Sequence, residues 1–259
     1  YHDRLIQEVI HTNNIGKLNA ILKGLVGNTI KLVTISDSDV LFLPNWQTET
    51  IKIFKKIPNA GVVGLVPQFK TYNSHCSNVI LDNLCNKKVK FLPVKNPKAL
   101  KQFYKSIGWK ANYNKALLDY NLGFEVDEET NTIIGSGHFV ATYKKDMFNE
   151  VISYIGFKLG GVSETYLDEA PLKKGYWRFT TYDNYAYHMG NTFEPWMETL
   201  SIKKNNIKVE DYNLQERGKV GALTYFIKNK LFKKVFALPV FNKWFLKFKG
   251  LPKHLVNKY

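Results

Sequence analysis

The sequence predicts an α/β domain with a mostly parallel central sheet and flanking helices, followed by a C-terminal amphipathic helical segment. Continuous rather than alternating apolar stretches at residues 29–36 and 60–68 are typical of strands buried on both faces of a parallel sheet. Helical patterns precede and separate them, as in α/β layers. After residue 216 the composition turns strongly basic. We therefore expect two parts, residues 1–215 and 216–259.

The elements are expected in a regular order. The patterns predict two helices within residues 3–25 with a break near 12–16, a strand at 29–36, a helix at 43–58 and a strand at 60–68. Strands and loops across the mouth of the sheet are expected for 70–131. Next come a strand, a turn at Gly135–Gly137, a strand and a helix from about Lys145, then an acidic helix closed by Gly175 and a strand from Tyr176 to about Gly190.

The composition narrows the class of protein. A hydrophobic content of 44% and an aromatic content of 14% indicate a folded chain rather than a disordered one. The formal net charge of +15 favours an anionic partner. No uncharged apolar run reaches the roughly 18 residues of a membrane-spanning helix. The cysteines Cys76 and Cys85 form neither a metal motif nor a disulfide framework, so a reducing cytoplasm is expected.

Two carboxylates end the first predicted strand. Asp37 and Asp39 lie at its carboxyl end, where parallel α/β sheets bind ligands. Because residues two apart on an extended chain point the same way, both carboxylates face one site. Such oxygen ligands suit Mg²⁺ or Mn²⁺, which often share their coordination shell with substrate phosphates. An Asp-rich turn that caps the next helix is the alternative, and this short motif alone does not separate the two.

The residues that precede the first predicted strand resemble a segment of a known enzyme family. The segment "NNIGKLNAILKGL" precedes the strand. It resembles a segment of the GT-A-fold glycosyltransferases, especially the inverting family-two group, in six residues: Asn14, Gly16, Lys17, Asn19, Gly24 and Leu25. The resemblance implies a Rossmann-like domain that transfers a sugar from a nucleotide-diphosphate sugar. It further implies that Asp39 holds the metal and the donor diphosphate, that Asp37 contacts the ribose or the metal, and that Asn14 and Lys17 lie near the nucleotide.

A glycine-rich stretch, "GSGHFVATYKKDMF", looks like the acceptor side of the same family, with Lys144 or Lys145 in place of the usual Arg. An ordinary glycine hairpin is the alternative. His138, beside Gly137, is a candidate for lining the acceptor pocket.

The acidic helix "SETYLDEAPLKKGYW" resembles the family's helix that carries the general base, which takes the proton of the attacking hydroxyl. Asp168 is the first candidate for this base, followed by Glu169 and Glu164, and a solvated helix face is the alternative for at least one of them. His188 follows a later strand and is expected to complete the metal shell or contact the diphosphate. A purely structural histidine is its alternative.

The family normally opens with a strand of the "S-I-I-I-P-x-Y-N" kind, and none precedes Tyr1. The expectation is that the first βαβ element of the fold lies outside this chain, or that the chain is a fragment.

The C-terminal segment combines aromatics with lysines. Arg217 to Tyr259 contain eleven Lys or Arg and neither Asp nor Glu, with nine aromatics interleaved. A helical stripe comprises Val240, Phe241, Trp244, Phe245 and Phe248, with Lys243, Lys247 and Lys249 largely opposite. This pattern is typical of a helix in a membrane interface. Packing of the stripe on the domain is the alternative. Nucleic acid is disfavoured, because the aromatics form no stacking sheet.

Together these features predict a metal-dependent glycosyltransferase of surface polysaccharide or glycolipid synthesis. It would use Mn²⁺ or Mg²⁺ and a nucleotide-sugar donor, first of all a UDP-sugar. Its acceptor would be a glycan or a lipid-linked molecule. The enzyme itself would lie in the cytoplasm, on the inner face of an anionic membrane. The alternative is a non-catalytic, degenerate or truncated transferase domain that binds membranes or partners. A metal-dependent phosphotransferase or nuclease is a weaker alternative, since no P-loop is present.

Overall fold

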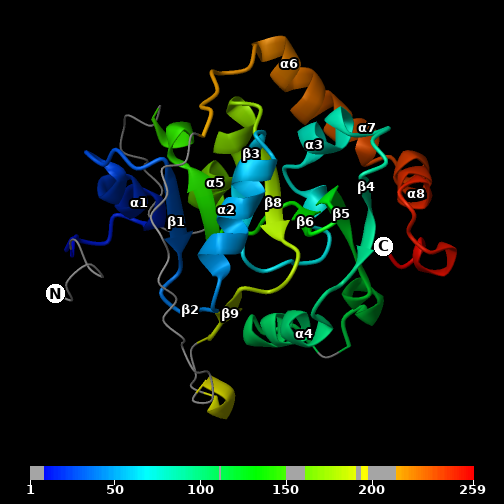
Figure 1. Ribbon diagram of the computed structural model, residues 1–259, viewed down its shortest axis with the longest axis horizontal. Helices are drawn as coiled ribbons and strands as arrows, with labels where there is room; N and C mark the ends of the chain where they lie inside the picture. Colours follow the sequence, from blue (N-terminus) through cyan, green and yellow to red (C-terminus); the bar gives the residue numbers. More distant parts are fainter. Residues whose placement is uncertain (1–8, 111, 150–160, 191–193, 198–213) are drawn as a thin grey trace.

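The computed structural model describes residues 9–110, 112–149, 161–190, 194–197 and 214–259, except for the side chains of residues 161–164 and 196. Within them the chain is an α/β protein with one large mixed sheet, a small second sheet and helices packed around both (Figure 1).

The elements follow in this order. The strands are β1 (Leu32–Ser36), β2 (Val40–Phe42), β3 (Ala60–Gly64), β4 (Val89–Pro93), β5 (Tyr120–Asp127), β6 (Thr130–Ile134), β7 (Val140–Lys144), β8 (Trp177–Thr181) and β9 (Ala186–His188). The α-helices are α1 (Lys17–Leu25), α2 (Trp46–Lys56), α3 (Ser77–Asp82), α4 (Pro97–Ser106), α5 (Gly161–Lys173), α6 (Ala222–Phe226), α7 (Phe232–Phe236) and α8 (Pro239–Phe248). Shorter turns of helix are η1 (Thr71–Asn73), η2 (Lys115–Leu118), η3 (Lys145–Phe148), η4 (Pro195–Met197), η5 (Ile227–Leu231) and η6 (Lys253–Leu255).

The large sheet has seven strands in the order β1-β7-β3-β8-β6-β5-β4. The expectation of a mostly parallel sheet is wrong: among the described strands only β3 and β8 pair in parallel, and the other neighbours are antiparallel. The reason is that β7 enters between β1 and β3 and runs against both, while β4, β5 and β6 form an antiparallel meander. A continuous apolar run reports burial on both faces of a strand, and burial does not fix its direction.

The carboxyl ends of β1, β3 and β8 nevertheless meet at one edge of the sheet. The register that pairs β7 with both β1 and β3 brings these ends level. Backbone hydrogen bonds join the segments that follow the strands: Leu43 N to Tyr185 O, and Tyr185 N to Leu65 O, both 2.9 Å. At the same edge β2 and β9 form the small two-stranded sheet, with Val40 opposite His188. The loop that carries the predicted Asp37 and Asp39, and β9, which ends in the predicted His188, therefore lie at this one edge.

The N-terminal expectations are met in part. The second predicted helix is present as α1, which begins after Gly16 at a positive φ of 80°. The predicted break near residues 12–16 is confirmed, whereas residues 9–11 form no helix, so the first predicted helix is wrong for that stretch, and residues 1–8 lie outside the described chain. The next helix, α2, begins at Trp46 rather than at residue 43, because Asn45 has left-handed backbone angles.

The middle of the chain contains more helix than expected. Residues 70–131 include α3 and α4, and their strands β4 and β5 extend the sheet instead of lying across its mouth. The glycine turn between strands and the helix closed by Gly175 are confirmed, whereas the helix predicted from about Lys145 is, in the described residues, only the short helical turn η3. The final strand prediction is wrong in one respect, because the stretch splits into β8 and β9, which belong to different sheets.

The C-terminal helices pack along α3 and β4 (Figure 1). Their inward residues belong to the same apolar cluster as residues of β3, α3, β4 and β5. The C-terminal members of this cluster are Phe232, Phe236, Phe245, Leu246, Leu251, Leu255 and Val256. Their other side stays exposed. Packing on the domain, the alternative considered for this segment, therefore holds for one side of the helices. In the chain that the structure describes, no helix has the length and apolarity needed to cross a bilayer.

Candidate active site

The loop between β1 and β2 carries both predicted carboxylates. Asp37 N donates a 2.8 Å hydrogen bond to Phe139 O, just before β7, and Asp39 O accepts one of 2.8 Å from Met189 N, just after β9. The loop is thus held between the entrance of one strand and the exit of another. Backbone anchors of this kind fix the two side chains at the carboxyl edge of the sheet without using the carboxylates themselves.

Asp37 faces the first turn of α1. Its Oδ1 lies 2.6 Å from the Nζ of Lys17, and both side chains are about one quarter to one third exposed. Asn14 serves the turn that leads into the helix, where its Oδ1 accepts a hydrogen bond from Gly16 N. The structure therefore brings Lys17 to the carboxylate loop, and Asn14 to the entrance of the helix that positions Lys17.

Asp39 faces His188. The Oδ2 of Asp39 lies 3.3 Å from Nε2 of His188, and Nδ1 of the ring lies 3.1 Å from Ser106 Oγ. Because the Ser106 hydroxyl donates to Phe103 O at 2.7 Å, its oxygen is left to accept a hydrogen bond from Nδ1–H. In the neutral ring this tautomer turns the lone pair of Nε2 toward a carboxylate oxygen. Two acceptors at this distance need a proton or a cation between them.

This donor pair fits a divalent cation. Carboxylate oxygen and imidazole nitrogen are both metal ligands, and their 3.3 Å separation suits two neighbouring ligands of one ion with bonds of about 2.1 Å. The hydrogen bond to Ser106 is the outer contact that commonly orients a ligating histidine. Among the described residues no group of three or more His, Cys, Asp or Glu surrounds such a point. Asp37 is paired with Lys17 instead of joining the other two.

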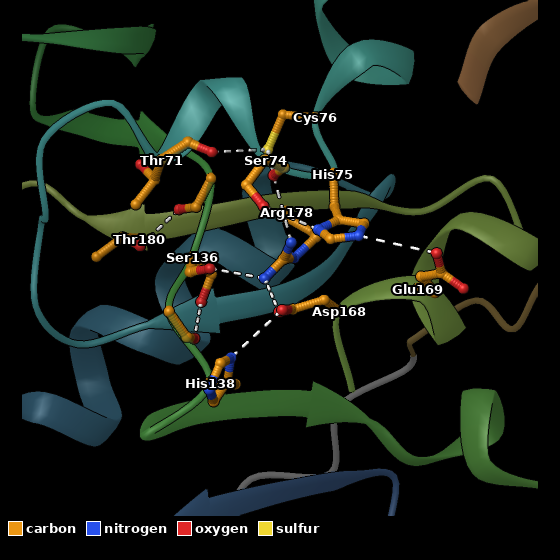
Figure 2. A network of polar contacts seen from close by, with 12 residues as sticks. Thr71, Ser74, His75, Cys76, Ser136, His138, Asp168, Glu169, Arg178 and Thr180 are labelled. Carbon is orange, nitrogen blue, oxygen red and sulfur yellow. Dashed lines mark hydrogen bonds and ion pairs between the residues drawn. The ribbon is translucent and has the colours of Figure 1, made fainter. Parts of the chain in front are cut away.

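A second cluster surrounds Asp168, in α5 (Figure 2). Its Oδ1 forms an ion pair with Arg178 of β8, a guanidinium that is only 1% exposed. Arg178 also donates to Ser136 O at 2.6 Å and to Ser74 O at 3.4 Å. The Oδ2 of Asp168 lies 3.3 Å from Nδ1 of His138. The predicted first candidate for the base is thus held on one side by a buried cation and on the other by an imidazole.

These partners control the protonation of the cluster. Burial by itself would raise the pKa of the Asp168 carboxyl, but the hydrogen bond with His138 and the nearby charge of Arg178 outweigh it and hold the pKa below its usual value. His75 flanks the cluster from the side of Arg178 (Figure 2). Burial, followed by the repulsion of Arg178, lowers the pKa of His75. At neutral pH the cluster therefore contains an ionised Asp168 and a neutral His75.

The other two candidates for the base differ from Asp168. Glu169 points toward His75, with 3.9 Å between its Oε1 and Nε2 of the ring, and its side chain is 36% exposed. Glu164 falls within the bounds of α5, but its side chain lies outside the described residues.

The glycine-rich segment links the two clusters. Gly135 N donates to Arg178 O at 2.8 Å, and Thr180 Oγ1 donates to Gly135 O at 2.6 Å, so the segment is fastened to β8. His138 follows on this segment, and the next residue, Phe139, accepts the hydrogen bond of Asp37 N. The predicted acceptor-side histidine therefore lies beside both the carboxylate loop and Asp168.

The two lysines of this stretch support the backbone. Lys144 is buried, and its Nζ donates to Pro58 O at 2.9 Å and to Gln215 O at 3.1 Å, while Lys145 Nζ donates to Asn28 O. Each lysine thus joins segments that are distant in the sequence.

Sequence reasoning missed Arg178 and Ser106. An arginine inside the apolar strand "YWRFT" is a usable signal, because a charged residue is almost never fully buried unless it is paired. Ser106 gave no signal, since a serine near the end of a helix is common. Its role here depends on a contact with His188, which lies far along the chain.

No protein-family model matches this chain, and searches of curated proteins and of solved structures find no significant match.

Proposed function

We propose that this protein is a GT-A-like glycosyltransferase that moves a sugar from a nucleotide-diphosphate sugar to an acceptor hydroxyl. The observation that carries the proposal is the pair of Asp39 and His188 at the carboxyl edge of β1, with its histidine tautomer set by Ser106. Lys17 of α1 is ion-paired with Asp37, which lies two residues before Asp39 in the same loop. A cation held by Asp39 and His188, together with Lys17, would suit an anionic diphosphate. The net charge of +15 also agrees with an anionic ligand.

Asp39 and His188 would hold Mn²⁺ or Mg²⁺, which supplies electrostatic stabilisation of the leaving diphosphate. Lys17 would complete the neutralisation of the phosphates from the side of α1. Because it is ion-paired with Asp37 at 2.6 Å, its ammonium group is already oriented toward the loop. This division of roles assigns the cation to Asp39 and His188, and the lysine to Asp37.

The proton of the acceptor hydroxyl would leave through the pair of His138 and Asp168. The lowered pKa of Asp168 makes its carboxylate a weak proton acceptor on its own. His138 is 34% exposed, more than the 14% of Asp168, and so is the better placed of the two for contact with an acceptor. Asp168 would orient the imidazole and stabilise its charge once the proton is bound. Glu169 and Glu164 remain secondary candidates for the base.

The C-terminal helices would dock on an anionic membrane at the cytoplasmic leaflet, which favours a lipid-linked or surface-glycan acceptor. Support comes from the outward apolar residues of this segment, which are Leu223, Phe226, Ile227, Leu231, Leu238, Val240, Trp244 and Phe248. Exposed lysines lie among them, including Lys230, Lys234, Lys243 and Lys247. Apolar side chains flanked by lysines suit the boundary between acyl chains and anionic headgroups.

A donor panel tests the proposed activity. UDP-, GDP-, TDP- and CMP-sugars are incubated with Mn²⁺ and a membrane lipid extract, and release of the nucleotide is measured. At least one donor should turn over in the wild type, and Asp39→Asn should abolish that turnover. Asp127→Asn is the matched control, because Asp127 is another partly exposed carboxylate, paired with Lys56, but it lies at the β5–β6 hairpin. Full turnover in Asp39→Asn, or no donor consumed by the wild type, contradicts the proposal and favours a binding module.

A further inference from the structure

A cavity of about 680 Å³ lies beside α4 and η2, within the size range of small-molecule sites. Its lining combines lysines with aromatic rings and one carboxylate, Glu194. The cavity and the candidate active site share helix α4, since Lys105 lines the cavity and the next residue, Ser106, is the hydrogen-bond partner of His188. In Figure 1, α4 lies next to β9, which ends in His188, and the two elements are in contact.

The lysines of the cavity follow from the helical period of α4. Lys98, Lys101 and Lys105 recur at intervals of three and four residues, so they lie along one face, while the opposite face is buried in the core. The rise of about 1.5 Å per residue spaces their origins by about 5 Å along the axis, which is comparable with one unit of a sugar chain. Among the described residues no ion pair engages Lys98 or Lys101, whereas Lys105 Nζ lies 3.2 Å from Glu194. The face therefore carries regularly spaced positive charge.

The aromatic part of the cavity is rigid. Trp109 is 46% exposed, and its ring packs against Tyr104 at 4.9 Å and against Phe69 at 5.2 Å between centroids. Tyr113 extends the cluster at 6.1 Å from Trp109. A fixed indole that is half open to solvent offers an apolar ring surface to a flat apolar partner. The C–H faces of sugar rings are partners of this kind.

Two polar atoms in the lining have unmet hydrogen-bonding capacity. Nε2 of Gln102 and the hydroxyl of Tyr113 are shielded from solvent, and neither has a hydrogen-bond partner in the described part of the protein. Buried polar atoms without a partner are uncommon in folded proteins, because each lost hydrogen bond costs free energy. Hydroxyl groups of a ligand, which both donate and accept, would satisfy both atoms.

We infer that this cavity is the acceptor subsite and that it binds a glycan carrying regularly spaced anionic groups, either carboxylates or phosphates. The lysines match the anions, Trp109 matches the ring faces, and Gln102 with Tyr113 matches the hydroxyls. Single-stranded nucleic acid is disfavoured, because the cavity presents one exposed indole rather than a series of stacking rings. The assignment as acceptor rests on the proposed transferase function, whereas glycan binding itself does not require turnover.

Titration calorimetry at low salt tests the binding. The probes are hexagalacturonate, a phosphodiester-linked mannose oligosaccharide, neutral maltohexaose and hexathymidylate. We expect at least one of the two anionic glycans to bind, with maltohexaose about tenfold weaker or more. Whichever of the two binds more tightly identifies the anion as carboxylate or phosphate. The double variant Lys98→Glu/Lys101→Glu should lower the affinity at least about tenfold. Lys243→Glu/Lys247→Glu, an equal charge change on the exposed side of α8, should leave it unchanged.

Three results would overturn the inference: unchanged glycan affinity in Lys98→Glu/Lys101→Glu, equal affinity for maltohexaose, or tighter lysine-dependent binding of hexathymidylate. Trp109→Ala is the second probe of the site, since loss of the indole should weaken all sugar ligands, charged or neutral. Asp39→Asn should retain glycan binding while losing turnover. Glycan binding without any donor turnover therefore refutes the transferase and leaves the binding site standing, and the reverse result refutes the binding site alone.

Discussion

Nε2 of His188 lies 3.3 Å from Oδ2 of Asp39, while Ser106 fixes the other nitrogen of the ring. This relationship joins the loop after β1 to the end of β9, two segments that are far apart in the sequence. The acidic motif alone has two interpretations, whereas the structure places Oδ2 of Asp39 and Nε2 of His188 as two neighbouring metal-ligand atoms. The proposed chemistry depends on this pair more than on any other contact.

Ser106 gives the first prediction. Ser106→Ala removes the acceptor for Nδ1–H, so the ring of His188 loses its fixed tautomer and orientation. Loss of an outer contact to a ligand typically weakens metal binding by about tenfold or more. The measurement is the Mn²⁺ concentration that half-saturates donor binding. Ser106→Thr keeps a hydroxyl and should behave much like the wild type, and identical Mn²⁺ affinities in the alanine variant and the wild type would contradict the role of Ser106.

The pairing of Asp168 with Arg178 leads to a prediction about stability. Asp168→Asn leaves a buried guanidinium without its counter-charge, and breaking a buried ion pair in this way costs about 3 kcal/mol of unfolding free energy. Urea unfolding measures the loss. Asp127→Asn, at an exposed ion pair, should change stability little. A loss in Asp168→Asn no larger than in this control would show that the buried pair has no structural role.

The same carboxylate predicts a pH dependence. The pKa of Asp168 is lower in the folded protein than in the unfolded chain, so its stabilising contribution is fully present above the unfolded value of about 4. That contribution is lost as the pH falls through the lower folded value. The difference in urea midpoint between wild type and Asp168→Asn should therefore shrink as the pH is lowered from 5 to 2.5. A difference that stays constant over this range would contradict the assigned pKa direction.

Gly64 provides a test of the packing around the glycine-rich segment. A Cβ at this position would lie 2.7 Å from Ser136 Oγ and 2.9 Å from Thr180 Oγ1. Gly64→Ala should cost about 1–3 kcal/mol of unfolding free energy, and adding Ser136→Ala should recover part of it. Gly24→Ala is the control, because nothing lies within 4 Å of its Cβ, and in helix α1 it should stabilise slightly. Similar stabilities of Gly64→Ala and wild type would mean that the segment does not lie against β3 as described.

The exposed side of α8 predicts membrane binding. Trp244→Ser/Phe248→Ser removes two stacked, half-exposed rings whose centroids lie 5.0 Å apart. In a vesicle co-sedimentation assay at low salt, the wild type should bind vesicles that contain anionic lipid. The affinity of the double variant for these vesicles should be lower by about tenfold or more. Trp109→Ser is the control, because it removes an exposed indole outside the C-terminal segment. Equal binding by the wild type and the double variant would remove the membrane from the proposal.

The sequence predicted those parts of the fold that depend on local pattern. Burial and helical period depend on residues that are close in the sequence. They therefore predicted the strands β1 and β3 and the helices α1, α2 and α5. The direction and order of strands were not, since the insertion of β7 between β1 and β3 is decided by tertiary packing. An apolar stripe likewise could not reveal that Phe245 packs inward while Trp244 stays exposed.

The candidate site shows the same division. Asp37 and Asp39 were visible as a short motif, and His188 and Asp168 could be named only through resemblance. Their actual partners, Lys17, Ser106 and Arg178, depend on contacts between distant segments. One departure from expectation is physical: Asp37 is already neutralised by a lysine, and this leaves Asp39 and His188 as the pair that fits a cation.

The most direct test is the cation-dependent binding of a nucleoside diphosphate. UDP, GDP and TDP are titrated calorimetrically into the wild type with MnCl₂ and again with EDTA in its place, and then into Asp39→Asn and Asp127→Asn. At least one nucleotide should bind the wild type and Asp127→Asn only with Mn²⁺, and Asp39→Asn should weaken this binding about tenfold or more. If no nucleotide binds in a Mn²⁺-dependent way, or if Asp39→Asn binds as tightly as the wild type, the proposed donor site is wrong.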